Sequence, residues 1–229
     1  MIEDISALMD LENLIGFFEQ LEPLMDNTKH PLDNESKLVI LHLTSILHST
    51  KQDSILSADE ITDIGELGLS FIEGLFLDMQ ATVETITHFN KMAMAFAYWV
   101  ALNGGALNHL DYPVNALATI ANTIHDKTRL EALYEIAAYM VSASTESVKT
   151  SADKTSGNSW RVLVMNYSII ATRTHNPDLM NSAFKTLLQY FPESAPEFFK
   201  QGMSEMIRLN YPQHVRVIME RYFEQYASE

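Results

Sequence analysis

Glu84 and His88 come closest to residues whose types and spacing could hold a metal ion. Four positions apart on a helix, they would lie on one face and could offer two ligands. A carboxylate-bridged metal centre in a helical bundle needs Glu-x-x-His pairs on facing helices, and the sequence has no second pair to support this one. The pattern therefore favours a solvated polar face shared with Lys91, and we predict no metal and no cofactor.

Motifs for catalysis are missing from the sequence. The chain has no cysteine, which excludes disulfides, thiolate zinc sites and cysteine nucleophiles. It also has no Gly-x-Ser-x-Gly elbow, no phosphate-binding glycine loop, no dinucleotide fingerprint and no His-Glu-x-x-His motif. We therefore assign no catalytic residue, and an enzyme is not the favoured interpretation.

Aromatic and arginine side chains are mixed over the C-terminal helices. Such residues dominate binding hot spots, so they are candidates for a partner surface. The candidate binding residues are Phe198, Arg208, Tyr211, Arg216, Arg221, Tyr222 and Tyr226. In the alternative interpretation, the aromatics belong to the core and the arginines pair with Glu220 and Glu224. The functional interpretation predicts a groove between the last helices that binds an acidic or aromatic-bearing peptide.

Negative charge is concentrated in the first part of the chain. Residues 1–90 contain 17 Asp or Glu and 3 Lys, whereas residues 91–229 contain 13 acidic and 12 basic residues. An acidic front half repels phosphate backbones and anionic lipids, so we predict no nucleic-acid and no membrane binding. It would attract a basic protein partner, although acidic surface also serves solubility alone. The acidic first part of one chain could also meet the more neutral second part of another across a homodimer, because complementary charge favours such contacts.

The segment 92–102 contains no formal charge and no helix breaker. The preceding turns from Val83 are amphipathic, so one helix becomes apolar on every side. A helix of that kind must be buried all round. It predicts a central helix over 83–102 against which the other helices pack.

Helical spacing dominates the rest of the chain, and no convincing strand pattern occurs. A first helix over 4–25 should kink or end at Pro23. A helix over 58–79 begins with the capping-box spacing of Ser57 and Glu60. Its Gly65 and Gly68 predict close approach of another helix, for which the small stripe Ala93, Ala97 and Ala101 is available, or else a break near Gly65. Three further helices are predicted over 35–48, 111–124 and 160–174. Four others are predicted from their first residues, which are Asp126, Asn176 with Pro177, a capping box of Ser194 and Glu197, and Pro212.

The predicted fold is all-α, with about ten helices in an irregular bundle or a short, solenoid-like array of helical hairpins around the central helix. Three similar helix starts carry Pro113, Pro177 and Pro212, whose separations approach the period of helical-hairpin repeats. We expect one domain over 1–229, with 1–85 and 86–229 as the alternative division. The Ser- and Thr-rich stretch 142–159 is the strongest linker candidate, although its first half can continue a helix.

The leading functional hypothesis is a non-catalytic module, adaptor or regulator that binds another protein. One alternative is a helical bundle that binds a small ligand or performs catalysis, with His88, His109 or Glu84 converging in an enclosed pocket. A second alternative is an acidic mimic or inhibitor of a nucleic-acid-binding partner. The N-terminus lacks the basic start and apolar core of a secretion signal and no apolar run is long enough to span a membrane, so we expect a cytoplasmic protein.

Overall fold

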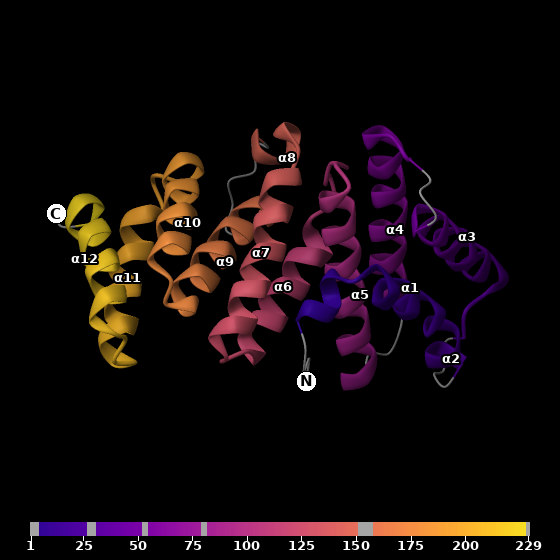
Figure 1. The fold of residues 1–229 in the computed structure, drawn as a ribbon, viewed down its shortest axis with the longest axis horizontal. Coiled ribbons are helices and arrows are strands. Elements are labelled where there is room, and N and C mark those ends of the chain that lie inside the picture. The colour runs from indigo at the N-terminus through magenta and orange to yellow at the C-terminus, as the bar shows by residue number, and fades with distance from the viewer. Residues whose placement is uncertain (1–4, 27–30, 52–54, 79–81, 151–157, 228–229) are drawn as a thin grey trace. The chain divides into compact units, whose positions relative to one another are not determined.

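The computed structural model describes residues 5–26, 31–51, 55–78, 82–150 and 158–227, and these residues form α-helices joined by turns (Figure 1). The predicted all-α class is confirmed. The described residues contain no strand, and Leu107 and Ser144 form an isolated bridge. The elements are the 3-10 helix η1 (Ser6–Met9) and the helices α1 (Leu11–Glu19), α2 (Leu21–Asp26), α3 (Asn34–Lys51), α4 (Ala58–Asp78), α5 (Val83–Leu102), α6 (Asp111–Thr123), α7 (Lys127–Ala143), α8 (Glu146–Thr150), α9 (Ser159–Thr174), α10 (Pro177–Tyr190), α11 (Ala195–Arg208) and α12 (Gln213–Tyr226).

Close backbone contacts divide the chain into two compact units. Unit 1 consists of Met1–Ile124 and Glu135–Thr150, and unit 2 consists of His125–Tyr134 and Ser151–Glu229. Unit 1 contains 20 acidic and 5 basic residues, whereas unit 2 contains 10 of each, so the whole net charge of −15 belongs to unit 1. The expectation of one domain, or of a division between residues 85 and 86, stays a prediction, because contacts do not measure independent folding.

Helix α5 is the core of unit 1. It contacts η1, α1, α4 and α6, and every residue from Met92 to Val100 is buried. Thr82 and Thr85 satisfy each other's backbone N–H groups in a capping box at its start. The predicted central helix is therefore confirmed, because a segment that is apolar on all sides is stable in water only when neighbours cover it.

Glycines of α4 let α5 approach closely, as predicted, but the facing residues differ from the expected alanine stripe. A Cβ on Gly65 would stand 3.0 Å from a methyl group of Val100, and a Cβ on Gly68 would overlap the ring of Phe96. The bulky side chains of α5 thus fill the space that the glycines leave, instead of small residues meeting small residues. No helix break occurs at Gly65.

The N-terminal helix is shorter than predicted. The expected helix over 4–25 is divided into η1, α1 and α2, because Asp10 leaves the helical conformation and caps α1 by accepting a hydrogen bond from the backbone N–H of Asn13. Pro23 does not end a helix. It lies in the first turn of α2, where a missing backbone N–H costs little.

Side-chain caps occur at most of the predicted helix starts. Ser57 and Glu60 form the predicted capping box of α4, and Asp33 and Asp126 accept backbone hydrogen bonds at the starts of α3 and α7. The predicted box of Ser194 and Glu197 is wrong. Ser194 has helical backbone angles and makes no cap, and its hydroxyl accepts a hydrogen bond from the guanidinium group of Arg161 instead.

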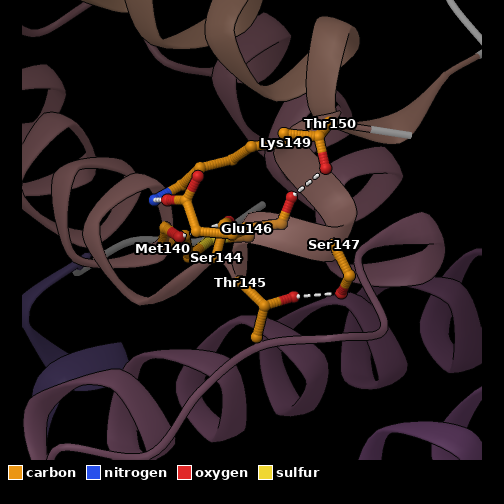
Figure 2. A network of polar contacts seen from close by, with 7 residues as sticks. All are labelled: Met140, Ser144, Thr145, Glu146, Ser147, Lys149 and Thr150. Carbon is orange, nitrogen blue, oxygen red and sulfur yellow. Dashed lines mark hydrogen bonds and ion pairs between the residues drawn. The ribbon is translucent and has the colours of Figure 1, made fainter. Parts of the chain in front are cut away.

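The first half of the predicted linker is folded. The backbone of Leu107 bonds to Ala143 and Thr145 on either side of Ser144, and the short helix α8 follows (Figure 2). Local hydroxyl contacts hold this corner together: Thr145 contacts Ser147, and Ser144 and Thr150 donate to backbone carbonyls. Residues 151–157 of the predicted linker lie outside the described residues, and its last two residues, Asn158 and Ser159, are the cap and the first residue of α9.

Unit 2 is built from two neighbouring helix pairs, α9 with α10 and α11 with α12, and α10 also contacts α12. Phe184 lies at the centre of this packing, with the rings of Phe199 and Tyr222 about 5 Å away and perpendicular to its own. Also from α9, Tyr167 stacks on Tyr134 of α7, and the two hydroxyls share a hydrogen bond. Burial raises the pKa of the Tyr167 hydroxyl, so this pair is a neutral core contact.

Among the described residues, no helix is both long enough and apolar enough to cross a membrane.

Candidate functional site

A groove of about 280 Å³ lies in unit 2 between α9 and α11. Apolar side chains from α9 and from both ends of α11 form its walls, and two of them, Ile169 and Leu209, are 44% and 51% exposed. Its full lining is Ile169, Thr172, Arg173, Phe198, Gln201, Gly202, Glu205, Met206, Leu209, Tyr211 and Met219.

The floor of the groove depends on a glycine. A Cβ on Gly202 would stand 2.6 Å from the terminal methyl of Met219 and 2.9 Å from its sulfur, so only glycine leaves the methionine in place. Met219 is fully buried and comes from α12. Because an unbranched thioether adapts to irregular shapes, this floor can adjust to the side chain that enters it.

Charges of both signs flank the apolar floor. Arg173 lines the groove from α9 and Glu205 lines it from α11. The carboxylate of Glu205 also accepts hydrogen bonds from Arg208, one turn further along the helix, and this contact lowers the pKa of Glu205. The groove therefore has an apolar interior and a rim without a strong net charge.

Tyr211 lines the groove and is half-buried. Burial raises the pKa of its hydroxyl, and the positive charge of Arg173 opposes that shift. The ring of Tyr211 lies 4.5 Å from the imidazole of His175, measured between centroids. His175 connects α9 to α10 with a left-handed backbone, and burial lowers its pKa. Tyr211 is thus held by packing, with its phenol ring available to the groove.

The structure divides the predicted binding residues among separate environments. Phe198 and Tyr211 line the groove together, and Arg208 lies beside it in an ion pair with Glu205. Arg221 and Tyr222 instead share the side-chain oxygen of Asn181 between α10 and α12. They belong to a second, open and polar depression that also contains Asp178 and Lys185.

Tyr222 and Tyr226 are largely explained by packing. Tyr222 is buried in the aromatic cluster, and Tyr226 lies against it and against Phe199. Arg221 extends over the ring of Tyr222, and its guanidinium group donates a hydrogen bond to the side-chain oxygen of Asn181. Arg216 is half-buried on α12 and lines neither depression. Binding through any of the seven residues stays a prediction.

Sequence reasoning missed the apolar residues that make the groove. Ile169 and Leu209 look like ordinary helix residues in the sequence, and only their exposure in the folded chain shows that no neighbour covers them. The sequence did contain a signal for close packing at Gly202, because a glycine inside a helix costs about 1 kcal/mol relative to alanine unless close packing compensates.

The polar face predicted around Glu84 and His88 is only partly solvated. Glu84 is exposed, but His88 is half-buried and its Nε2 atom donates to the carbonyl oxygen of Phe17 at 2.8 Å. Within the described ranges, no group of three or more His, Asp or Glu side chains is arranged to hold a metal ion.

A smaller hollow of about 170 Å³ lies between η1, α1 and the end of α5. Tyr98 and Trp99 contribute to its wall, and Asp10 is its acidic residue. The Asp10 carboxylate caps α1, and burial raises the pKa of the Tyr98 hydroxyl, which favours its neutral form. We therefore interpret this hollow as a packing gap in unit 1.

Comparison of the chain with protein-family models, with curated proteins and with solved structures found no match.

Proposed function

We propose that this protein is a non-catalytic interaction module, and that the groove between α9 and α11 anchors an amphipathic helical segment of a partner protein. The observation that carries the proposal is the pair of exposed residues, Ile169 and Leu209, beside an apolar hollow. Exposed apolar surface of this kind, rimmed by polar residues, is typical of protein-binding sites.

The size of the groove supports a protein partner over a small ligand. Ligand pockets commonly measure about 300–1,000 Å³ and enclose most of their ligand, whereas this groove measures about 280 Å³ and is open along one side. It suits one or two apolar side chains that project from a larger partner. Helix-in-groove recognition uses anchors of this type at helical spacing.

The chemistry of the lining does not favour catalysis. Arg173, Glu205 and Tyr211 are its ionisable groups. The Glu205 carboxylate is bonded to Arg208, which favours its charged form, and burial keeps the Tyr211 hydroxyl protonated. A general acid–base pair needs groups with pKa values near the working pH, and these residues do not supply one.

The test begins with a random peptide library selected on the full-length chain. A selected peptide is then labelled and titrated against the wild type, Leu209→Glu and Ile207→Glu. We expect Leu209→Glu to weaken binding at least tenfold, because a charge would enter the apolar wall and cost more than about 1.4 kcal/mol.

Ile207→Glu is the matched control. Ile207 lies on the same turn of α11 and is 67% exposed, but it does not line the groove. It should change affinity less than twofold. Equal effects of the two substitutions, or selected peptides without apolar anchors at helical spacing, would refute the proposal.

The proposal includes a cytoplasmic location. It is also compatible with a homodimer in which the acidic unit 1 of one copy binds unit 2 of the other. Fluorescence microscopy of a tagged full-length chain tests the first, and light scattering over a range of protein concentrations tests the second. A dimer that Leu209→Glu dissociates would mean that the groove receives a second copy instead of a partner.

A further inference from the structure

Helix α4 of unit 1 (Figure 1) carries a stripe of apolar residues that its neighbours cover only in part. Its inner side packs on α5 and α6. Along the border of that side, Ile64, Leu67 and Phe71 follow one another at three- and four-residue spacing, and Leu75 continues the line. Leu67 is 45% exposed and the others are half-buried. Leu77 comes two residues after Leu75, so it lies off the stripe on the exposed side of the helix, and it is 73% exposed. The stripe is therefore an apolar surface that the described residues cover only in part, with Leu67 as its most exposed member.

Gly74 lies beside this stripe and has no packing role in the described chain. A Cβ placed on it would meet no atom within 4 Å, in contrast to Gly65 and Gly68 on the inner side. A glycine in an exposed helix interior costs about 1 kcal/mol relative to alanine. A flat site of this kind lets a second helix approach closely, so the unexplained glycine points to an occupant on the outer face.

Carboxylates surround the stripe. Helix α4 contains six acidic residues and no lysine or arginine. By helical spacing, Asp63 lies beside Leu67 and Asp78 lies beside Leu75, and both carboxylates are exposed. They stand on the unit that contains the entire net charge of −15. An occupant with a complementary surface therefore has an apolar face bordered by lysine or arginine.

We propose that the outer face of α4 binds a basic amphipathic helix of a partner protein. Charge decides between this occupant and the others. A second copy would bring the same acidic face and be repelled, and nucleic acids and anionic membranes are repelled for the same reason. The exposed leucines also separate this face from an acidic mimic of nucleic acid, because Leu67 and Leu77 interrupt the row of carboxylates. The site lies on unit 1 and is independent of the groove in unit 2.

The test uses a synthetic peptide of about twenty residues, with leucines along one helical face and lysines on the others, and a scrambled peptide of the same composition. Both are titrated against the full-length protein at two salt concentrations. We expect the amphipathic peptide to bind at least tenfold more tightly than the scrambled one. Hydrogen exchange should show new protection within 59–78.

Substitutions locate the binding and control for general attraction. Leu67→Ser and Leu77→Ser should each weaken binding severalfold, and Asp63→Lys should weaken it about tenfold and reduce its salt dependence. Glu220→Lys on α12 changes the net charge by the same amount and should have less than a twofold effect. All four positions are exposed, so circular dichroism should show unchanged helix content.

Three results would overturn the proposal: equal binding of the scrambled peptide, equal effects of Asp63→Lys and Glu220→Lys, or protection that appears outside α4. Light scattering of the protein alone distinguishes the second-copy alternative. A concentration-dependent dimer that Leu67→Ser abolishes would assign this face to self-association and would also overturn the proposal.

Discussion

Gly68 of α4 lies directly against the ring of Phe96 of α5, so that a methyl group on the glycine would overlap the ring. The ring has no room to retreat, because it is fully buried and lies 5.6 Å from the ring of Phe18 and 5.7 Å from that of Trp99. The absence of one side chain thus sets the distance between the two longest helices of unit 1.

Gly68→Ala should destabilise the protein by about 2 kcal/mol, even though alanine is the better helix former. Overpacking of a core typically costs about 1–3 kcal/mol, and the gain in helix propensity offsets only about 1 kcal/mol of it. The control is Gly74→Ala on the open side of α4, which should stabilise the protein by about 0.5–1 kcal/mol. Urea unfolding of both variants measures the difference, and the same sign for both would contradict the packing described here.

His88 should make stability depend on pH below neutrality. Burial lowers the pKa of His88, and Lys91 lowers it further, against the opposing effects of Glu84 and the Phe17 carbonyl. The unfolded chain then binds a proton more readily than the folded one. Stability is therefore retained above about pH 6.5, the ordinary histidine value, and falls as the pH drops toward the folded pKa.

Urea unfolding of the wild type and His88→Gln from pH 8 to pH 5 checks this expectation. Glutamine keeps a hydrogen-bond donor for Phe17 but cannot be protonated in this range. The variant should lose part of the acid sensitivity, and the remainder should include His175, whose pKa burial also lowers. Identical pH profiles for the two proteins would show that His88 is not a source of the effect.

Ser57→Ala and Ser194→Ala compare a formed capping box with one that does not form. Ser57→Ala should cost about 1 kcal/mol, because the backbone N–H of Glu60 loses its partner. Ser194→Ala removes only the hydroxyl that accepts from Arg161, and its effect should be smaller and should vanish in an Arg161→Lys background. Thermal unfolding of the single and double variants measures both effects. A larger loss for Ser194→Ala would contradict the observed caps.

Gly202→Ala should affect binding more than stability. The new Cβ would displace only the flexible end of Met219, so we expect less than about 1 kcal/mol of destabilisation. The displaced methionine would narrow the groove, and a peptide selected on the wild type should bind several times more weakly. Calorimetric titration and urea unfolding of the same variant separate the two effects. A stable variant with unchanged affinity would show that the floor of the groove does not receive the partner.

The sequence alone determined the local features of this protein. The apolar run 92–102 required burial on every side, and α5 occupies the range 83–102 that this pattern predicted. Ser57 and Asp126 cap helices as predicted, because a cap depends on a side chain and a backbone N–H only two or three residues apart. Such contacts are available to the chain before any tertiary structure forms.

Tertiary structure decided which distant residues meet. Gly68 predicted a close neighbour, but only packing selected Phe96 over the alanine stripe. Ser194 had the spacing of a cap, but Arg161 took its hydroxyl. Phe198 joined the groove while Tyr222 entered the core, because burial depends on neighbours that are far away in the chain. Ile169 and Leu209 show the same rule: their residue types were plain in the sequence, but their exposure was fixed only when the helices of unit 2 packed and left a groove between α9 and α11.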